Sequence, residues 1–298
     1  MFKGHPHLDT DHALILIDRL KGHVEEMVFG GGDPLLRKDL PTLINRAFDN
    51  DLRVEVQTNA QILTSEFVKN VKERVIRWGF SLDSCDPRVH DAIRGRLGNY
   101  KKVTEIAARL TAAGINWNLR TLVARPTLTT VEPIGEWLQS IQFRGNWYLL
   151  QYAAVGDEMH NRQHFEISDS EFRTTVEPIA KKYSQSSFRT ISVPDGDRRQ
   201  IYFLIAPDGD VYNHPLPGHP YVVVGNILSN TFDDLLKKLN INFQAHYMRY
   251  GVPETLRVAA HGSPTDIRAN SSVGAHPERL GAKETHSIFD TGPLEPGT

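Results

Sequence analysis

Cysteine is nearly absent from this sequence, and its scarcity excludes whole classes of site. Cys85 is the only cysteine among 298 residues, so the chain can form neither an internal disulfide nor a metal site with several thiolate ligands of its own. No apolar run approaches the roughly 20 residues that a membrane-spanning helix needs, and the first residues lack the apolar region of a signal peptide. We therefore expect a cytoplasmic protein that does not bind a membrane.

An excess of charge of one sign is also missing. The formal net charge is −2 at pH 7, and the sequence has neither the basic face nor the basic amphipathic helix that binding to nucleic acid or to a membrane surface requires. Hydrophobic residues make up 40% of the chain, which is enough for a substantial core. We expect a globular protein whose ligand is a small molecule or a peptide.

Helical and strand patterns alternate from residue 9 to about residue 183. The first helix is predicted by the apolar spacing of Ala13, Leu16 and Ile17, with Asp9 or Asp11 as its cap. Five segments have the composition of strands, and each is followed by a helical pattern: residues 25–30, 53–59, 75–84, 117–126 and 146–156. This order predicts an α/β protein with a parallel sheet or barrel.

The pattern changes after residue 185. The segments RTISVPDG, IYFLIAPDGDVYNHP and YVVVGNIL have the composition of short strands separated by Pro-Asp-Gly and Gly-Asn turns, which predicts a small antiparallel β appendage. The segment TFDDLLKKL adds a helix with Thr231 as its cap. Residues 251–298 are rich in Gly, Pro, Ser and Thr without an apolar period, so we expect a disordered C-terminal tail.

The ends of the predicted strands carry the residues suited to chemistry, because ligands of parallel α/β proteins bind at the carboxyl ends of the strands. The first end reads GGGDP, residues 30–34. Gly31 and Gly32 let the backbone approach a ligand closely, Asp33 can accept from an ammonium group, and Pro34 restricts the turn. Taken alone, this run favours the ordinary interpretation, a tight turn between a strand and a helix.

Together with the next strand ends, this segment resembles the radical S-adenosylmethionine (SAM) enzymes, especially the branch that modifies peptides and natural products. The family's GGEP-like motif is residues 31–34 here, with aspartate in place of the commoner glutamate. Its TNG motif is Thr58-Asn59-Ala60, its SLDS motif is residues 81–84, and its HDxxRG motif is residues 90–95. The resemblance covers residues 8 to about 230.

The resemblance implies a fold and a domain organisation. We expect a partial (β/α)6 TIM-like barrel that lacks its first strand over residues 1–185. Residues 186–250 are similar to the SPASM/twitch-like module of that branch, in which a PxG hairpin precedes a VGNI strand. In relatives with an auxiliary iron–sulfur cluster this module carries cysteines, and here it has none.

The resemblance also implies SAM as cofactor and a set of residues that position it: Gly31, Gly32, Asp33, Pro34, Asn59, Ser81, Asp83, Arg94, Val123 and Tyr152. In the family the GGEP-like motif holds the amino group of SAM. A planar guanidinium such as that of Arg94 suits the carboxylate, Ser81 and Asp83 can bond the ribose hydroxyls, and exposed backbone near the last two residues of the set can take adenine. Two alternatives stay open: Arg94 forms a surface ion pair with Asp91, or Asp83 caps the next turn.

The family's CxxxCxxC motif, whose three thiolates hold a [4Fe–4S] cluster, is absent from this sequence. With SAM, that cluster generates a 5′-deoxyadenosyl radical that abstracts a hydrogen atom from the substrate. Either the cysteine segment and the first strand lie upstream of Met1 in the same reading frame, or the chain is a cluster-free descendant. We favour truncation, because a barrel without its first strand leaves an exposed edge.

The function expected from the sequence follows from these points. It is an N-terminally truncated radical SAM enzyme that modifies a peptide or small natural product by hydrogen abstraction, with a reductant protein as a further partner. The alternative is a non-catalytic module that binds SAM or a peptide without a cluster. No catalytic side chain and no metal ligand is predicted within the chain itself.

Overall fold

A parallel sheet of six strands organises the computed structural model, which describes residues 6–154, 162–198, 201–213 and 221–250. The strands pair in chain order, each parallel to the next: β1 (Glu26–Phe29), β2 (Arg53–Gln57), β3 (Val75–Ser81), β4 (Trp117–Val123), β5 (Asn146–Gln151) and β6 (Arg189–Val193). The predicted α/β class with a parallel sheet is confirmed. The predicted disordered tail, residues 251–298, lies outside the described residues.

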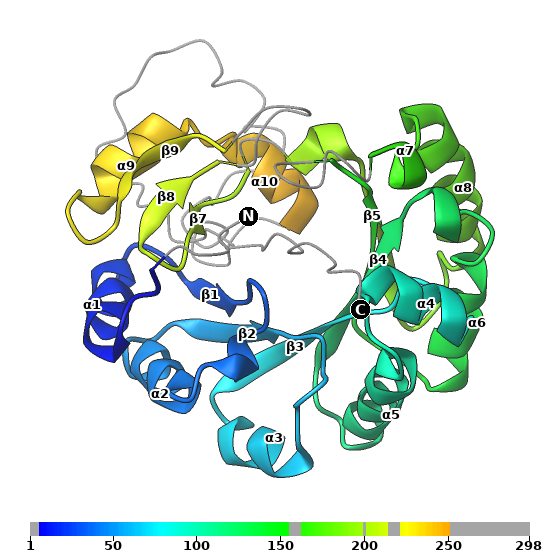
Figure 1. Cartoon of the computed structure of the whole chain (residues 1–298), viewed down its shortest axis with the longest axis horizontal. Coiled ribbons are helices and arrows are strands. Elements are labelled where there is room, and N and C mark those ends of the chain that lie inside the picture. The colour runs from blue at the N-terminus through cyan, green and yellow to red at the C-terminus, as the bar shows by residue number, and fades with distance from the viewer. Residues whose placement is uncertain (1–5, 155–161, 199–200, 214–220, 251–298) are drawn as a thin grey trace, which may run out of the picture.

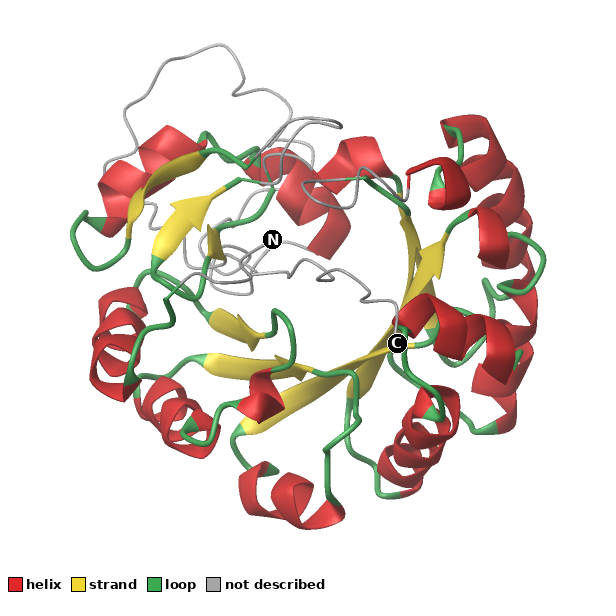
Figure 2. Ribbon diagram, viewed as in Figure 1, coloured by secondary structure: helices red, strands yellow, loops and turns green. Residues whose placement is uncertain are grey.

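The strands follow an arc, and helices lie along its outer side (Figures 1 and 2). The helices of this layer are α1 (Thr10–Leu20), α2 (Leu40–Asp49), α3 (Ser65–Val71), α4 (Pro87–Arg94), α5 (Asn99–Ala112), α6 (Glu132–Ser140), α7 (Arg162–Phe165) and α8 (Asp169–Lys182). Short 3₁₀ turns occur at η1 (Pro34–Leu36), η2 (Arg125–Thr127) and η4 (Asp195–Arg198). The sheet therefore has a convex face under helices and a concave face.

Local sequence signals explain where several helices begin. The carboxylate of Asp9 accepts from the backbone N–H of His12 at 2.9 Å, so Asp9 is the cap of α1. Ser168 and Glu171 form a reciprocal capping box at the start of α8. Asp39 occupies the cap position of α2 without a capping bond; Arg37 and Thr10 bind its carboxylate instead.

The two faces of the sheet differ in chemistry, because successive side chains of a strand point to opposite sides. On the convex face Val56, Trp78 and Trp147 are wholly buried in one core with the apolar stripes of the helices. On the concave face, the register places Glu55 opposite Arg77, and Arg120 opposite Tyr148. The concave face therefore carries charged and polar groups instead of the branched apolar residues that fill an ordinary barrel.

A second sheet follows, with antiparallel strands β7 (Leu204–Ile205), β8 (Asp210–Tyr212) and β9 (Val223–Asn226). Gly209, with a φ of 89°, makes the predicted Pro-Asp-Gly turn between β7 and β8. The helices α9 (Phe232–Leu239) and α10 (Phe243–Tyr250) complete this part. The small antiparallel appendage is confirmed, but placing RTISV within it was wrong: that segment is β6 and pairs in parallel with β5. The division at residues 185 and 250 stays a prediction.

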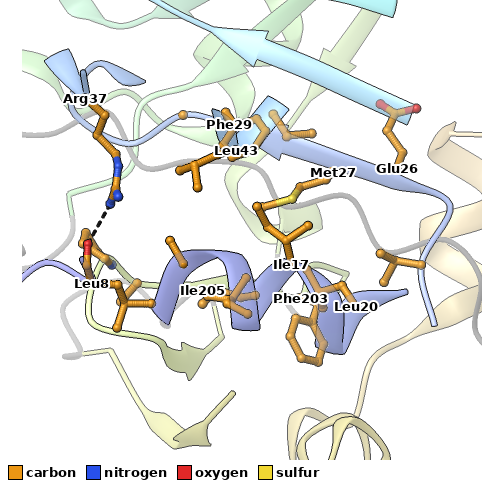
Figure 3. A pocket seen from close by; sticks show the side chains of 17 residues that line it. Leu8, Ile17, Leu20, Glu26, Met27, Phe29, Arg37, Leu43, Phe203 and Ile205 are labelled. Carbon is orange, nitrogen blue, oxygen red and sulfur yellow. Dashed lines mark hydrogen bonds between the residues drawn. The ribbon is translucent and has the colours of Figure 1, made fainter. Parts of the chain in front are cut away.

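Strand β1 is the edge of the parallel sheet, and the second sheet lies beside it and α1 (Figure 1). Between α1, β1 and β7 there is a cavity of about 140 Å³ with mainly apolar walls (Figure 3). Glu26 lies at one end of it; at the other, the Arg37 guanidinium donates to the carbonyl of Leu8 at 3.0 Å. None of the side chains predicted to bind a cofactor lines this cavity, so we place the candidate site elsewhere.

Candidate functional site

The loops that follow β1 and β2 are joined by the carboxylate of Asp33. It accepts from the Thr58 hydroxyl at 2.9 Å, the backbone N–H of Asn59 at 3.2 Å and the backbone N–H of Leu35 at 3.0 Å. Burial raises the pKa of Asp33 above its ordinary value, although these three donors oppose the shift. A carboxylate has about four acceptor positions, so Asp33 keeps capacity for one further donor.

The glycines and the proline beside Asp33 shape this loop. Gly31 has a φ of 92°, in the left-handed region that favours glycine. A Cβ added to Gly32 would meet no atom within 4 Å, so open space lies in front of its backbone. Pro34 starts the short η1 turn directly after Asp33. The loop therefore presents backbone groups and one carboxylate at the carboxyl end of β1.

Two buried side chains connect the β2 loop to the loop after β3. The Asn99 amide donates to the carbonyl of Asn59 at 2.9 Å and to Gln61 Oε1 at 3.1 Å. Its own oxygen lies 3.0 Å from Nε2 of His90, whose Nδ1 accepts from the backbone N–H of Asp83 at 3.1 Å. These contacts assign the neutral tautomer of His90 with its proton on Nε2. Burial lowers the pKa of His90 and so favours that neutral form.

The network ends in a buried ion pair between Asp83 and Arg94. Arg94 donates through Nε and Nη2 to the two carboxylate oxygens at 2.6 and 2.8 Å. Asp83 also accepts from the backbone N–H of Leu122 on β4 at 2.9 Å, and its side chain has no exposed surface. The Nη1 group of Arg94 makes no hydrogen bond within the described residues. Arg94 can therefore bind a ligand carboxylate through Nη1, whereas Asp83 reaches a ribose only if the pair opens.

Both alternative interpretations of this region are wrong. Asp91 does not pair with Arg94, because its carboxylate caps α5 by accepting from the backbone N–H groups of Gly98 at 2.6 Å and Tyr100 at 2.8 Å. Asp83 does not cap the next turn, because Asp86 does so for α4. In the HDxxRG segment, His90 thus links Asp83 to Asn99, Asp91 caps α5, and Arg94 forms the ion pair with Asp83.

The other predicted cofactor residues differ in how accessible they are. Ser81, the last residue of β3, is half-buried, and its hydroxyl has no hydrogen bond within the part of the chain that the structure describes. Val123 and Tyr152 are buried, and the carbonyl of Val123 accepts from the backbone N–H of Tyr152 at 3.0 Å. The expectation of exposed backbone at these two residues is wrong, because sheet pairing continues past the end of β5.

A thiolate-held cluster does not fit the residues of this chain. The thiol of Cys85, the only cysteine, has its pKa raised to about 11 by burial, so it stays protonated at neutral pH. Within the described residues no group of three or more His, Cys, Asp or Glu side chains could hold a metal ion. In the same residues no helix has the length and apolar character of a membrane span.

Sequence reasoning missed Asn99, the residue that joins the two halves of the network. Its partners Asn59 and His90 lie 40 and 9 positions away in the chain. The one signal in the sequence was the position of Asn99 directly after Gly98, at the start of α5. An asparagine at the start of a helix is also explained by helix capping, so this position alone does not indicate a role in the network. The site is thus four motif segments brought to one edge of the sheet and bonded to each other.

Comparisons with known proteins point to one superfamily. Residues 1–138 match the family model described as the radical SAM superfamily. The chain is 34% identical over 127 residues to an AdoMet-dependent heme synthase of Nitratidesulfovibrio vulgaris, covering 42% of this chain and 35% of that protein. It is 23% identical over 261 residues to an S-adenosylmethionine-dependent nucleotide dehydratase of Selenomonas ruminantium, covering 84% and 91%.

The fold is shared with a solved complex of SuiB from Streptococcus suis with its precursor peptide SuiA. The TM-score is 0.62 at 12% identity, and the match covers 78% of this chain and 58% of that one. The chain spans well under half the length of the heme synthase, which is the first of these relatives. The family model covers residues 1–138, a little under half of this chain, so the comparisons show that this part of the chain is similar to the radical SAM superfamily.

Proposed function

We propose that this chain is the SAM-binding core of a radical SAM enzyme that modifies a peptide or a small natural product by hydrogen abstraction. One observation carries the proposal: a continuous set of hydrogen bonds joins the GGDP, TNA, SLDS and HDAIRG segments at a single edge of the sheet. Preorganised groups of this kind bind a ligand without the cost of ordering them first. The SuiB–SuiA complex, which shares the fold, supports a peptide as one class of substrate.

In this proposal each group meets a complementary part of SAM. The remaining acceptor position of Asp33 and the backbone of Gly31 and Gly32 bind the ammonium group. Arg94 binds the carboxylate through Nη1, held in place by Asp83. The hydroxyl of Ser81 bonds the ribose. Pro34 and Asn59 shape the loops, and Val123 and Tyr152 contribute packing at the adenine end.

SAM fits these residues, but the iron–sulfur cluster does not, because one protonated cysteine cannot replace three thiolates. When bound, the cluster supplies the electron that cleaves SAM in this superfamily. The residues of this chain bind and orient the cofactor. In the proposal, the thiolates come from protein sequence outside these 298 residues.

Calorimetry of SAM with the purified full chain tests this function directly. We expect measurable binding that weakens at least about tenfold in Asp33→Asn, which keeps the shape of the side chain but removes the charge that faces the ammonium group. The matched control is Asp49→Asn on the exposed end of α2, which should bind as the original protein does. Absence of any binding heat with folded protein would overturn the proposal.

A second candidate is supported by the same single cysteine: a module that binds SAM or a peptide without radical chemistry. The coding sequence upstream of Met1 separates the two. A CxxxCxxC motif in the same frame supports the enzyme, and anaerobic reconstitution of the extended protein with iron and sulfide should then yield 5′-deoxyadenosine. An in-frame stop codon shortly upstream of Met1, with no cysteine triplet encoded between that stop codon and Met1, supports the module.

A further inference from the structure

The concave face of the sheet carries a buried ladder of alternating charges. Glu55 on β2 lies between Arg77 on β3, whose Nε is 2.6 Å from Oε2, and Arg120 on β4, whose Nη2 is 3.0 Å from Oε1. Arg77 also donates to Glu26 on β1. Burying so many charges costs more free energy than filling the same space with apolar side chains. A polar ligand that binds to these charges on the concave face would explain why the protein carries them there.

The backbone makes room for this ladder at Gly79 on β3. A Cβ at this position would lie 2.6 Å from Nη1 of Arg120 and 2.8 Å from Cγ of Gln57. Both distances are shorter than real Cβ contacts, so any other residue at this position would displace the Arg120 guanidinium and the Gln57 side chain. The position of Arg120 is therefore set by its neighbours in the sheet.

Two hydrogen-bond donors on this face have no acceptor within the described residues. Nη1 of Arg120 is buried and makes no hydrogen bond. The hydroxyl of Tyr148 on β5 accepts from Asn146 Nδ2 at 3.3 Å, but no acceptor takes its proton. The Arg120 guanidinium carbon lies 5.3 Å from the centre of the Tyr148 ring, so the two side chains that carry these donors are neighbours on the concave face.

The carboxylates of the ladder cannot supply the missing acceptor. Glu55 already accepts from Arg77, Arg120 and Gln57. Burial opposes its ionisation, yet the two arginines hold its pKa at about 2, so Glu55 stays charged and internally neutralised. What the face lacks is an acceptor for Nη1 of Arg120, because a buried donor of a charged group is expensive to leave unpaired.

We propose that Arg120 and Tyr148 bind an oxyanion, a carboxylate or phosphate group, of the substrate. This inference rests on the proposed function and adds the substrate's charge and its anchoring point. Arg120 is opposite Ser81 in the sheet register, so the oxyanion subsite lies on the concave face next to the edge where SAM is proposed to bind. A substrate held there by its anionic end presents its remaining atoms toward that edge.

The probes that test this subsite are inorganic pyrophosphate and succinate, each titrated into the ¹⁵N-labelled full chain. The readout is the NMR signal of the arginine Nε–H groups. We expect the signal of Arg120 to shift and to saturate with at least one probe. Tighter binding of pyrophosphate indicates a phosphate-bearing substrate, and tighter binding of succinate indicates a carboxylate-bearing one.

Three variants make the titration specific. Tyr148→Phe removes one donor and should weaken binding about two- to tenfold, whereas Arg120→Gln should weaken it by more. Arg46→Gln, which alters an arginine paired with Asp18 on the surface, should bind as the original protein does. Because Arg120→Gln also breaks a bond to Glu55, Tyr148→Phe carries the test if that variant does not fold.

Two outcomes would overturn the inference: no shift of Arg120 with either probe, or equal binding by the original protein and Tyr148→Phe. The affinity of Tyr148→Phe for SAM is measured in parallel and should be unchanged. Failure of the oxyanion subsite is therefore distinguishable from failure of the SAM site, which Asp33→Asn reports.

Discussion

Replacing Asn99 by alanine tests whether the hydrogen bonds at the sheet edge act as one unit. Asn99 is 2% exposed, and its side-chain amide bonds His90 on α4 and two groups, of Asn59 and Gln61, in the loop after β2. Asn99→Ala leaves the Nε2–H of the wholly buried His90 without an acceptor, which costs about 1–3 kcal/mol, and removes two further bonds worth about 0.5–1.5 kcal/mol each. Water can hydrate the half-buried Asn59 and Gln61 in part, so we expect a total loss of about 2–4 kcal/mol.

Urea unfolding followed by tryptophan fluorescence measures this loss of stability. The matched control is Asn50→Ala, because Asn50 is also a buried asparagine but makes one side-chain bond, to Asp18, at the opposite end of β2. We expect that control to lose about 1 kcal/mol and to keep its SAM affinity, whereas Asn99→Ala should lose affinity at least about tenfold. A loss below about 0.5 kcal/mol in Asn99→Ala, within the range of a neutral surface change, would refute the reasoning.

Three further predictions concern other parts of the site. Burial lowers the pKa of His90, so as the pH falls through about 6.5 the unfolded chain takes up a proton that the folded chain does not. The folded state is therefore less stable at lower pH, and the urea concentration at the unfolding midpoint should decrease when the pH is lowered from 7.5 to 5.5. This decrease should be smaller in His90→Gln. Gly79→Ala should lose about 1–3 kcal/mol by crowding Arg120, whereas Gly32→Ala, which meets no atom, should unfold at the same urea concentration as the original protein. The alkylation rate of Cys85 by iodoacetamide should keep rising up to about pH 11, and a plateau near pH 9 would contradict its raised pKa.

Local patterns predicted most of the elements because their causes are local. The apolar stripe and cap of α1 and the turn at Gly209 each depend on residues a few positions apart. The segment RTISV was misassigned because a short strand before a Pro-Asp-Gly sequence has the composition of a hairpin strand. Its partner β5 is separated from it by α7 and α8, so only packing reveals the parallel pairing.

The sequence by itself determined which loops meet, since the carboxyl ends of successive parallel strands lie along one edge of a sheet. Only the tertiary structure decided which atoms bond there: Arg94 with Asp83 instead of Asp91, and Asn99 between His90 and Asn59. It also decided that charges line the concave face, with Nη1 of Arg120 left unpaired among the described residues. Hydrogen bonds between residues far apart in the chain depend on distances of a few tenths of an ångström, and periodicity and motif spacing do not contain those distances.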